Sequence, residues 1–83
     1  MGFGIIVDEL HGRYHSFTMA DDTMYDGMVE SYKRDGRNVI CGRKGIPDKE
    51  IDNIADRMGG ILKRLNEGEP LILKELESVL NPI

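Results

Sequence analysis

The chain has 83 residues, a net charge of −4 and one cysteine, which exclude two independent cores and an internal disulfide. Its composition, 40% hydrophobic and 31% charged, is typical of a soluble globular domain. No apolar run approaches the roughly 20 residues that span a bilayer, and the first residues lack the basic flank of a signal peptide. The sequence therefore predicts a single domain over residues 1–83, without a membrane segment, in a reducing cytoplasm.

Charge is distributed unevenly along the chain. Residues 1–30 carry a net charge of −5, residues 31–45 carry +4, and residues 46–83 carry −3. The acidic majority disfavours nonspecific binding to nucleic acid or to an acidic membrane. Only the middle segment has the opposite character.

The first 20 residues are typical of a β-hairpin. Two stretches rich in β-branched and aromatic residues flank His11-Gly12, and a glycine at the second turn position can adopt the positive φ of a tight turn. With this turn, Ile6 faces Phe17 and Asp8 faces His15. The first strand is apolar on both of its faces, which favours a central position in the sheet.

The next segment predicts a helix over residues 23–34. Asp21-Asp22-Thr23 supplies N-cap candidates, and apolar residues then recur at helical spacing as far as Tyr32. Cations follow in the last turn, where they complement the helix dipole, and Gly36 can end the helix in a left-handed cap.

Residues 37–41 predict a short strand, and the glycines and proline of residues 42–47 indicate a loop after it. A second helical pattern then runs to Leu65, but Gly59-Gly60 interrupts it. Two glycines cost an isolated helix about 2 kcal/mol relative to alanines. A kink, a break or a close backbone contact is therefore expected there.

The last segment, residues 71–80, keeps helical spacing from Ile72 to Leu80, and a strand over residues 71–76 is the alternative. The complete order is ββαβαα. We expect an α+β fold in which a three-stranded sheet, the hairpin plus one strand, is covered by two to three helices. A right-handed crossover would place the third strand parallel to the second. The edges of such a sheet leave self-association open.

The basic segment has two interpretations. Its cations and glycines fit a helix end and its cap, so local structure explains most of it. The alternative is an anion or nucleic-acid site formed by Lys33, Arg34, Arg37, Arg43 and Lys44. Arg37 and Arg43 flank the expected strand and would lie roughly 20 Å apart, which weakens the hypothesis of a single pocket.

Catalytic and metal-binding patterns are weak in this sequence. A hairpin turn separates His11 from His15, and no acid or cysteine cluster completes a metal-ligand set. Cys41 next to an isoleucine on a short strand is typical of packing rather than of a nucleophile. The sequence therefore predicts a protein that is not an enzyme and that uses no metal or cofactor.

Two acidic blocks remain as candidates for function. Solvated helix faces often carry such acids, but an acidic surface can also bind the positive groove of a nucleic-acid-handling protein. The predicted partner-binding residues are Asp21, Asp22, Asp26, Glu30, Asp52 and Asp56, with Tyr25 and Tyr32 as anchors.

These residues favour a small acidic regulator or inhibitor of a protein partner. Inhibitors that phages and other mobile elements direct at host defence systems are of this kind. The alternative function is a nucleic-acid-binding regulatory protein that uses the basic segment, residues 33–44.

Overall fold

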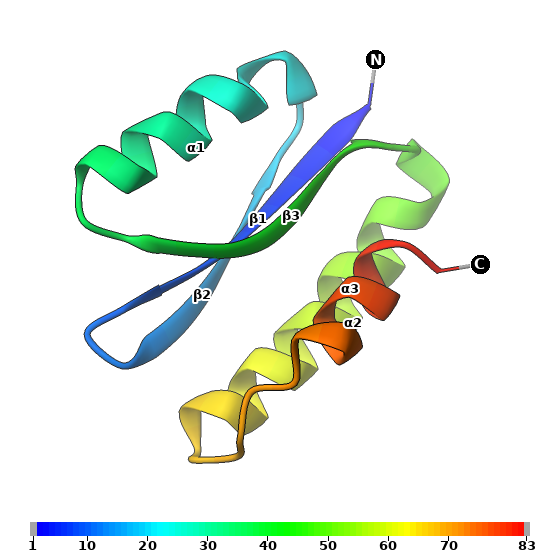
Figure 1. The fold of residues 1–83 in the computed structure, drawn as a ribbon. Helices are drawn as coiled ribbons and strands as arrows, with labels where there is room; N and C mark the ends of the chain where they lie inside the picture. Colours follow the sequence, from blue (N-terminus) through cyan, green and yellow to red (C-terminus); the bar gives the residue numbers. More distant parts are fainter. Residues whose placement is uncertain (1, 83) are drawn as a thin grey trace.

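A computed structural model describes residues 2–82, which form a three-stranded sheet with helices on both of its faces (Figure 1). The elements are β1 (Phe3–Leu10), β2 (Arg13–Met19), α1 (Tyr25–Arg34), β3 (Asn38–Ile46), α2 (Asp48–Asn66) and α3 (Leu73–Leu80). The α+β class and the order ββαβαα are confirmed.

The hairpin has the predicted turn and register. His11 and Gly12 have φ values of 53° and 81°, and a type I′ turn needs a positive φ at both of its central residues. Ile6 lies opposite Phe17, and Asp8 lies opposite His15. A two-residue turn sets the pairing of the two strands, so the turn signal at His11-Gly12 was sufficient to predict the register.

The strand order is β2-β1-β3, with β1 antiparallel to both neighbours. The central position predicted for the first strand is confirmed, and its residues Gly4 to Asp8 are all buried. Because β2 and β3 are both antiparallel to β1, they run parallel to each other. This parallel relation is the one predicted for the second and third strands.

The predicted end of the third strand is wrong. Instead of ending at Cys41 before a loop, β3 continues to Ile46, and Gly42 pairs with Ile6 inside the sheet. Two register shifts interrupt the pairing of β3 with β1. Gly45, with a φ of 75°, lies at one of these irregularities, where a left-handed residue is common. Gly42 and Gly45 therefore lie within β3 and do not end it.

The first helix lies close to its predicted range. A single 3₁₀ turn, Asp22–Met24, leads into α1, and the side chain of Asp21 caps it by accepting a hydrogen bond from the Thr23 amide. Gly36 follows the helix with a φ of 82°, as expected for a left-handed cap.

The double glycine neither breaks the second helix nor contacts other backbone. α2 is continuous from Asp48 to Asn66, and a Cβ atom at Gly59 or Gly60 would meet nothing within 4 Å. The buried residues of α2 hold it against the sheet and against α3, which offsets the low helix propensity of the glycines. The final segment is a helix, α3, so the strand alternative for residues 71–76 is wrong.

The sheet separates a larger core from a smaller one. Ile5 and Val7 of β1 pack with Ile46 and with the apolar faces of α2 and α3. The alternate residues of β1 face α1, on the other side of the sheet (Figure 1). Ile6 is fully buried on that side, whereas none of the ten residues of α1 is fully buried. The chain therefore forms three layers, and α1 is the least enclosed helix.

Candidate functional site

The two longer helices begin at the same end of the sheet. In the chain, β3 follows α1 and precedes α2. The end of α1 therefore lies near the start of β3, and the start of α2 lies near the end of β3 (Figure 1). Each helix carries acids in its first turn and bases in its last turn, as the helix dipole favours. The topology therefore gathers acids from both helices at one end of the molecule. We call this the acidic end; its residues are Asp21, Asp22, Asp26, Asp48 and Glu50.

Three of the predicted partner-binding acids have roles in the fold. Asp21 accepts hydrogen bonds from the amide and the hydroxyl of Thr23, at 3.0 and 2.8 Å, and these bonds lower the pKa of its carboxyl. Asp22 accepts a 2.7 Å bond from the Gly45 amide and so ties the 3₁₀ turn to β3. Asp26 forms an exposed ion pair with Lys44 at 3.2 Å.

The other three predicted acids have no such role. Glu30, Asp52 and Asp56 are exposed, and within residues 2–82 no basic side chain lies within ion-pair distance of them. Asp52 and Asp56 lie one turn apart on the exposed face of α2. Glu30 lies on α1, across the sheet from them (Figure 1). The predicted acids therefore occupy two faces rather than one continuous surface.

The two predicted tyrosine anchors are partly buried by packing inside the protein. The Tyr25 ring lies over Gly4 and Gly42 of the sheet, where a Cβ at either position would crowd it. Burial is the main cause of its raised pKa. The Tyr32 ring lies under the guanidinium of Arg37, whose Cζ is 5.2 Å from the ring centroid, and burial also raises the pKa of Tyr32.

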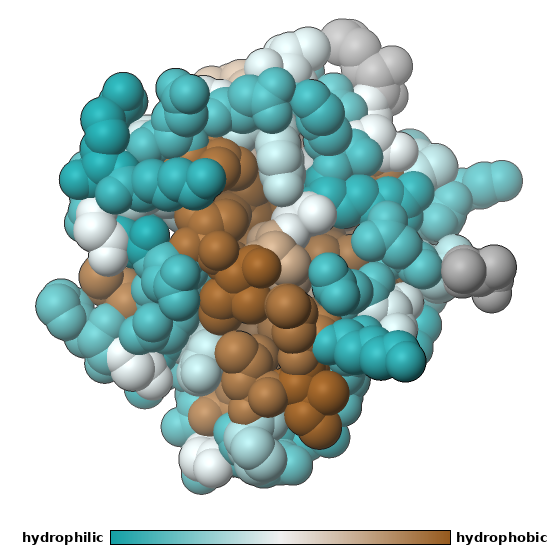
Figure 2. All heavy atoms as spheres, viewed as in Figure 1, coloured by the Kyte–Doolittle hydropathy of each residue, from teal (hydrophilic) through white to brown (hydrophobic). Residues whose placement is uncertain are grey.

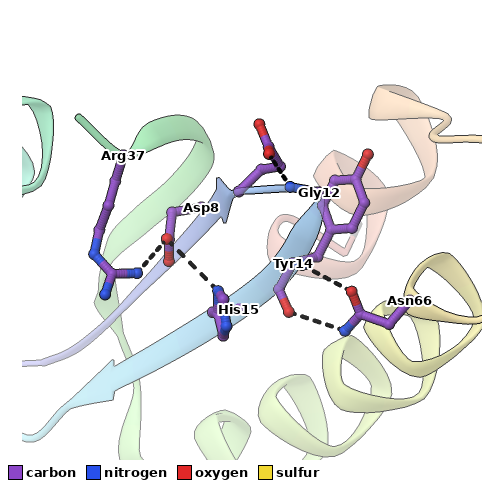
Figure 3. A network of polar contacts seen from close by, with 7 residues as sticks. Asp8, Gly12, Tyr14, His15, Arg37 and Asn66 are labelled. Atoms are coloured by element: carbon purple, nitrogen blue, oxygen red, sulfur yellow. Dashed lines mark hydrogen bonds and ion pairs between the residues drawn. The ribbon is translucent and has the colours of Figure 1, made fainter.

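A buried carboxylate lies at the other end of α1. Asp8 in β1 is 1% exposed, and its Oδ2 accepts a 2.8 Å hydrogen bond from Arg37. His15 on the neighbouring strand points at the same oxygen, with its Nδ1 3.9 Å away (Figure 3). The hydrogen bond to Asp8 is the main reason why the pKa of Arg37 is raised above its ordinary value. Arg37 compensates the buried charge of Asp8, so its removal would leave that charge without a partner.

The structure divides the basic segment. Arg37 is bound to Asp8, whereas Arg43 donates a 2.6 Å hydrogen bond to the carbonyl of Leu80 and Lys44 pairs with Asp26. Arg43 stands within β3 opposite Ile5, rather than in the loop that the sequence predicted. The five cations therefore lie in separate places. Of these five cations, Lys33 and Arg34 are the two that are exposed and have no ion pair with another residue of the range 2–82.

Cys41 is a half-buried thiol that packs against the main core. Burial, and to a lesser extent the negative charge of Glu77, raise its pKa to about 11. A thiol is a much weaker nucleophile than a thiolate, so this environment suppresses its reactivity near neutral pH. Elsewhere in residues 2–82, no group of three or more histidine, cysteine or acidic residues could hold a metal ion. Over the same residues, every helix is too short or too polar to cross a membrane.

The sequence did not indicate an exposed apolar segment around the start of α3. Leu71, Ile72 and Leu73 are 41%, 55% and 44% exposed, although the helical pattern placed the last two in a buried stripe. Ile72 precedes the first residue of α3, so that pattern does not apply to it. Figure 2 shows apolar atoms gathered on this face, over β3 and the segment leading into α3.

In comparisons with protein-family models, curated proteins and solved structures, nothing matched this chain.

Proposed function

We propose that the protein is a small non-enzymatic regulator that binds a cationic surface of another protein through its acidic end. The main support is the common starting point of α1 and α2, which gathers the first-turn acids of both helices. Asp52 and Asp56 continue the acids of α2 from the acidic end along the exposed face of that helix. This proposal favours them as contact residues, since both are exposed and have no ion pair among residues 2–82. Opposite charges on two partners speed their encounter and set their orientation.

The partner would be a nucleic-acid-handling protein whose positive groove normally receives phosphates. An acidic protein that occupies such a groove acts as an inhibitor. The specific target that we propose is a nucleic-acid-handling protein of a host defence system. The inhibitor would then be encoded by a phage or another mobile element. Cys41 is a free, half-buried thiol. Free thiols are typical of proteins in a reducing cytoplasm, which is the location that we propose.

The test is capture of partners from a bacterial lysate on the immobilised protein, compared between charge variants. In the test variant, Asp52→Lys is combined with Asp56→Lys. The matched control combines Glu69→Lys with Glu77→Lys, two exposed acids elsewhere that give the same change in charge. We expect the test variant to lose a captured nucleic-acid-binding protein that the control retains. A capture pattern that is identical for all three proteins would contradict the proposal.

A second candidate function is nucleic-acid binding at the end of α1, because Lys33 and Arg34 remain exposed there. This function requires binding of labelled duplex DNA or single-stranded RNA at low salt, with an affinity that falls steeply as salt increases. The combination of Lys33→Ala and Arg34→Ala should then abolish binding. Arg37 is unsuitable for this test because its replacement would also uncover Asp8. A flat titration at low salt would exclude this candidate.

A further inference from the structure

The outer edge of β2 is open over part of its length. Along an antiparallel strand, successive residues direct their backbone groups alternately toward and away from the neighbouring strand. Tyr14 directs both of its groups away from β1, because its amide and its carbonyl both bond to Asn66 of α2 (Figure 3). By the same alternation, Ser16 and Thr18 point outward. Among residues 2–82, no hydrogen bond outside the sheet involves their backbone groups.

Asn66 shows how this edge can be paired. Its side-chain amide accepts a 2.8 Å hydrogen bond from the Tyr14 amide and donates a 3.0 Å bond to the Tyr14 carbonyl. A residue of an added antiparallel strand makes this same pair of bonds. The side chain therefore closes the edge at Tyr14, while the next two outward-pointing residues remain open.

A hollow of about 560 Å³ lies between β2 and α2, next to the open edge. Ser16 lines it from the strand, and Gly59 lines it from the helix without filling it, since a Cβ there would meet nothing within 4 Å. Two cations, Arg13 and Lys63, also line the hollow, against the single acid Glu67. The hollow can therefore receive side chains, and its charge favours acidic ones.

Phe17 supplies an apolar contact on the opposite face of the same edge, next to the polar His15. Phe17 pairs with Ile6, on the side of the sheet that faces α1, and it is 41% exposed. A strand added to β2 would direct alternate side chains to the two faces of the sheet. One set would lie beside Phe17, and the other set would enter the hollow next to Lys63.

We propose that the edge of β2 at Ser16 and Thr18, together with this hollow, binds an extended segment of a partner protein in which acidic and apolar residues alternate. The segment adds a fourth strand, with its acids in the hollow and its apolar side chains beside Phe17. Backbone hydrogen bonds supply affinity and the alternation supplies specificity, as in other cases of strand addition. A second copy of β2 fits less well, because its sequence, RYHSFTM, contains a cation and no acid.

The test uses a dye-labelled six-residue peptide of alternating Glu and Val with blocked ends, and measures fluorescence polarisation. The matched variants are Gly59→Leu and Gly60→Leu. Both glycines lie in α2 with open space around them, but Gly60 lines a different hollow, between α2 and α3. We expect Gly59→Leu to weaken binding by about tenfold or more and Gly60→Leu to leave it unchanged. A Lys-Val peptide of the same length should not bind.

Hydrogen exchange of backbone amides supplies a second readout, and its first part uses the wild-type protein alone. On the wild-type protein, the Glu-Val peptide should slow exchange at Ser16 and Thr18. With Asn66→Ala it should also slow exchange at Tyr14, whose backbone groups are then uncovered. The proposal is overturned if the peptide does not bind at about 1 mM, or if both glycine variants weaken binding equally. It is also overturned if light scattering shows a dimer in which these amides are already protected without peptide, since the occupant would then be a second copy.

Discussion

Arg37 Nη1 lies 2.8 Å from Asp8 Oδ2 and joins the start of β3 to the buried centre of β1. Removing one partner of a buried ion pair leaves a charge without compensation. The Arg37 side chain is 32% exposed, so solvent would moderate this effect. We expect Arg37→Ala to lower the free energy of unfolding in urea denaturation, because Asp8, which is 1% exposed, loses its hydrogen-bonded partner.

Arg34→Ala is the control for this prediction, since Arg34 is exposed and has no ion pair among residues 2–82. It should change the free energy of unfolding by no more than about 0.5 kcal/mol. Equal effects of the two substitutions would show that Asp8 does not depend on Arg37.

Gly42 is required by the packing of Tyr25 against the sheet. A Cβ atom at this position would overlap the Tyr25 hydroxyl and lie 2.8 Å from the carbonyl oxygen of Ile5. We expect Gly42→Ala to cost about 1–3 kcal/mol of unfolding free energy, as overpacked sites usually do. Tyr25→Phe should restore part of this loss, because it removes the overlapping hydroxyl.

Gly27→Ala is the matched control for Gly42→Ala, because a Cβ at Gly27 of α1 would meet nothing within 4 Å. It should stabilise the protein by up to about 1 kcal/mol through helix propensity. A cost for Gly42→Ala that does not change in the Tyr25→Phe background would rule out the proposed overlap.

The Asp21 cap predicts a dependence of stability on pH. Hydrogen bonds from Thr23 lower the pKa of the Asp21 carboxyl from its ordinary 3.8. The ionised cap therefore stabilises the fold fully above pH 3.8, and this contribution is lost as the pH falls through the lowered value. We expect Asp21→Ala to lower the Tm at pH 7, with a smaller difference from wild type below pH 3.8. A difference that stays constant across this range would contradict the assignment.

Cys41 should react slowly with alkylating reagents in the folded protein. Its pKa is raised from 9.0 to about 11, so at pH 8 the thiolate fraction is about 100-fold lower than at the ordinary value. We expect iodoacetamide to modify the native protein about 100-fold more slowly than the urea-unfolded chain, with a rate that rises with pH toward about 11. Circular dichroism would confirm that the protein remains folded over this range.

The raised pKa of Cys41 also determines how the stability of the fold changes with pH. The protonated thiol favours the fold fully below pH 9.0, and this contribution is lost as the pH rises toward about 11. A midpoint near 9.0 in the alkylation profile of the native protein would contradict the raised pKa.

The elements that could be predicted from the sequence are those with local signals. The turn at His11-Gly12, the cap at Asp21 and the stop at Gly36 each depend on neighbouring residues, so their positions followed from short stretches. The register of the hairpin followed from its turn, and the amphipathic patterns indicated the three helices.

The missed features depend on residues far apart in the chain. Gly42 resembles a loop residue until the Tyr25 ring is placed over it. The bonds between Asn66 and Tyr14 join residues separated by 52 positions, and no local pattern indicates them. The candidate acids were recognisable from charge alone. The role of Asp22 in the fold, by contrast, required the position of β3.

The common starting point of α1 and α2 has an electrical consequence. The peptide dipoles of the two helices add, because both helices point their positive ends the same way, while the acids at those ends oppose them. The molecule is 35 Å long, whereas the Debye length is about 10 Å in 0.1 M salt and about 30 Å in 0.01 M salt. In dilute buffer an approaching charged body therefore acts on both ends at once and can rotate the molecule before contact. At physiological salt, orientation is decided only in the last nanometre of approach.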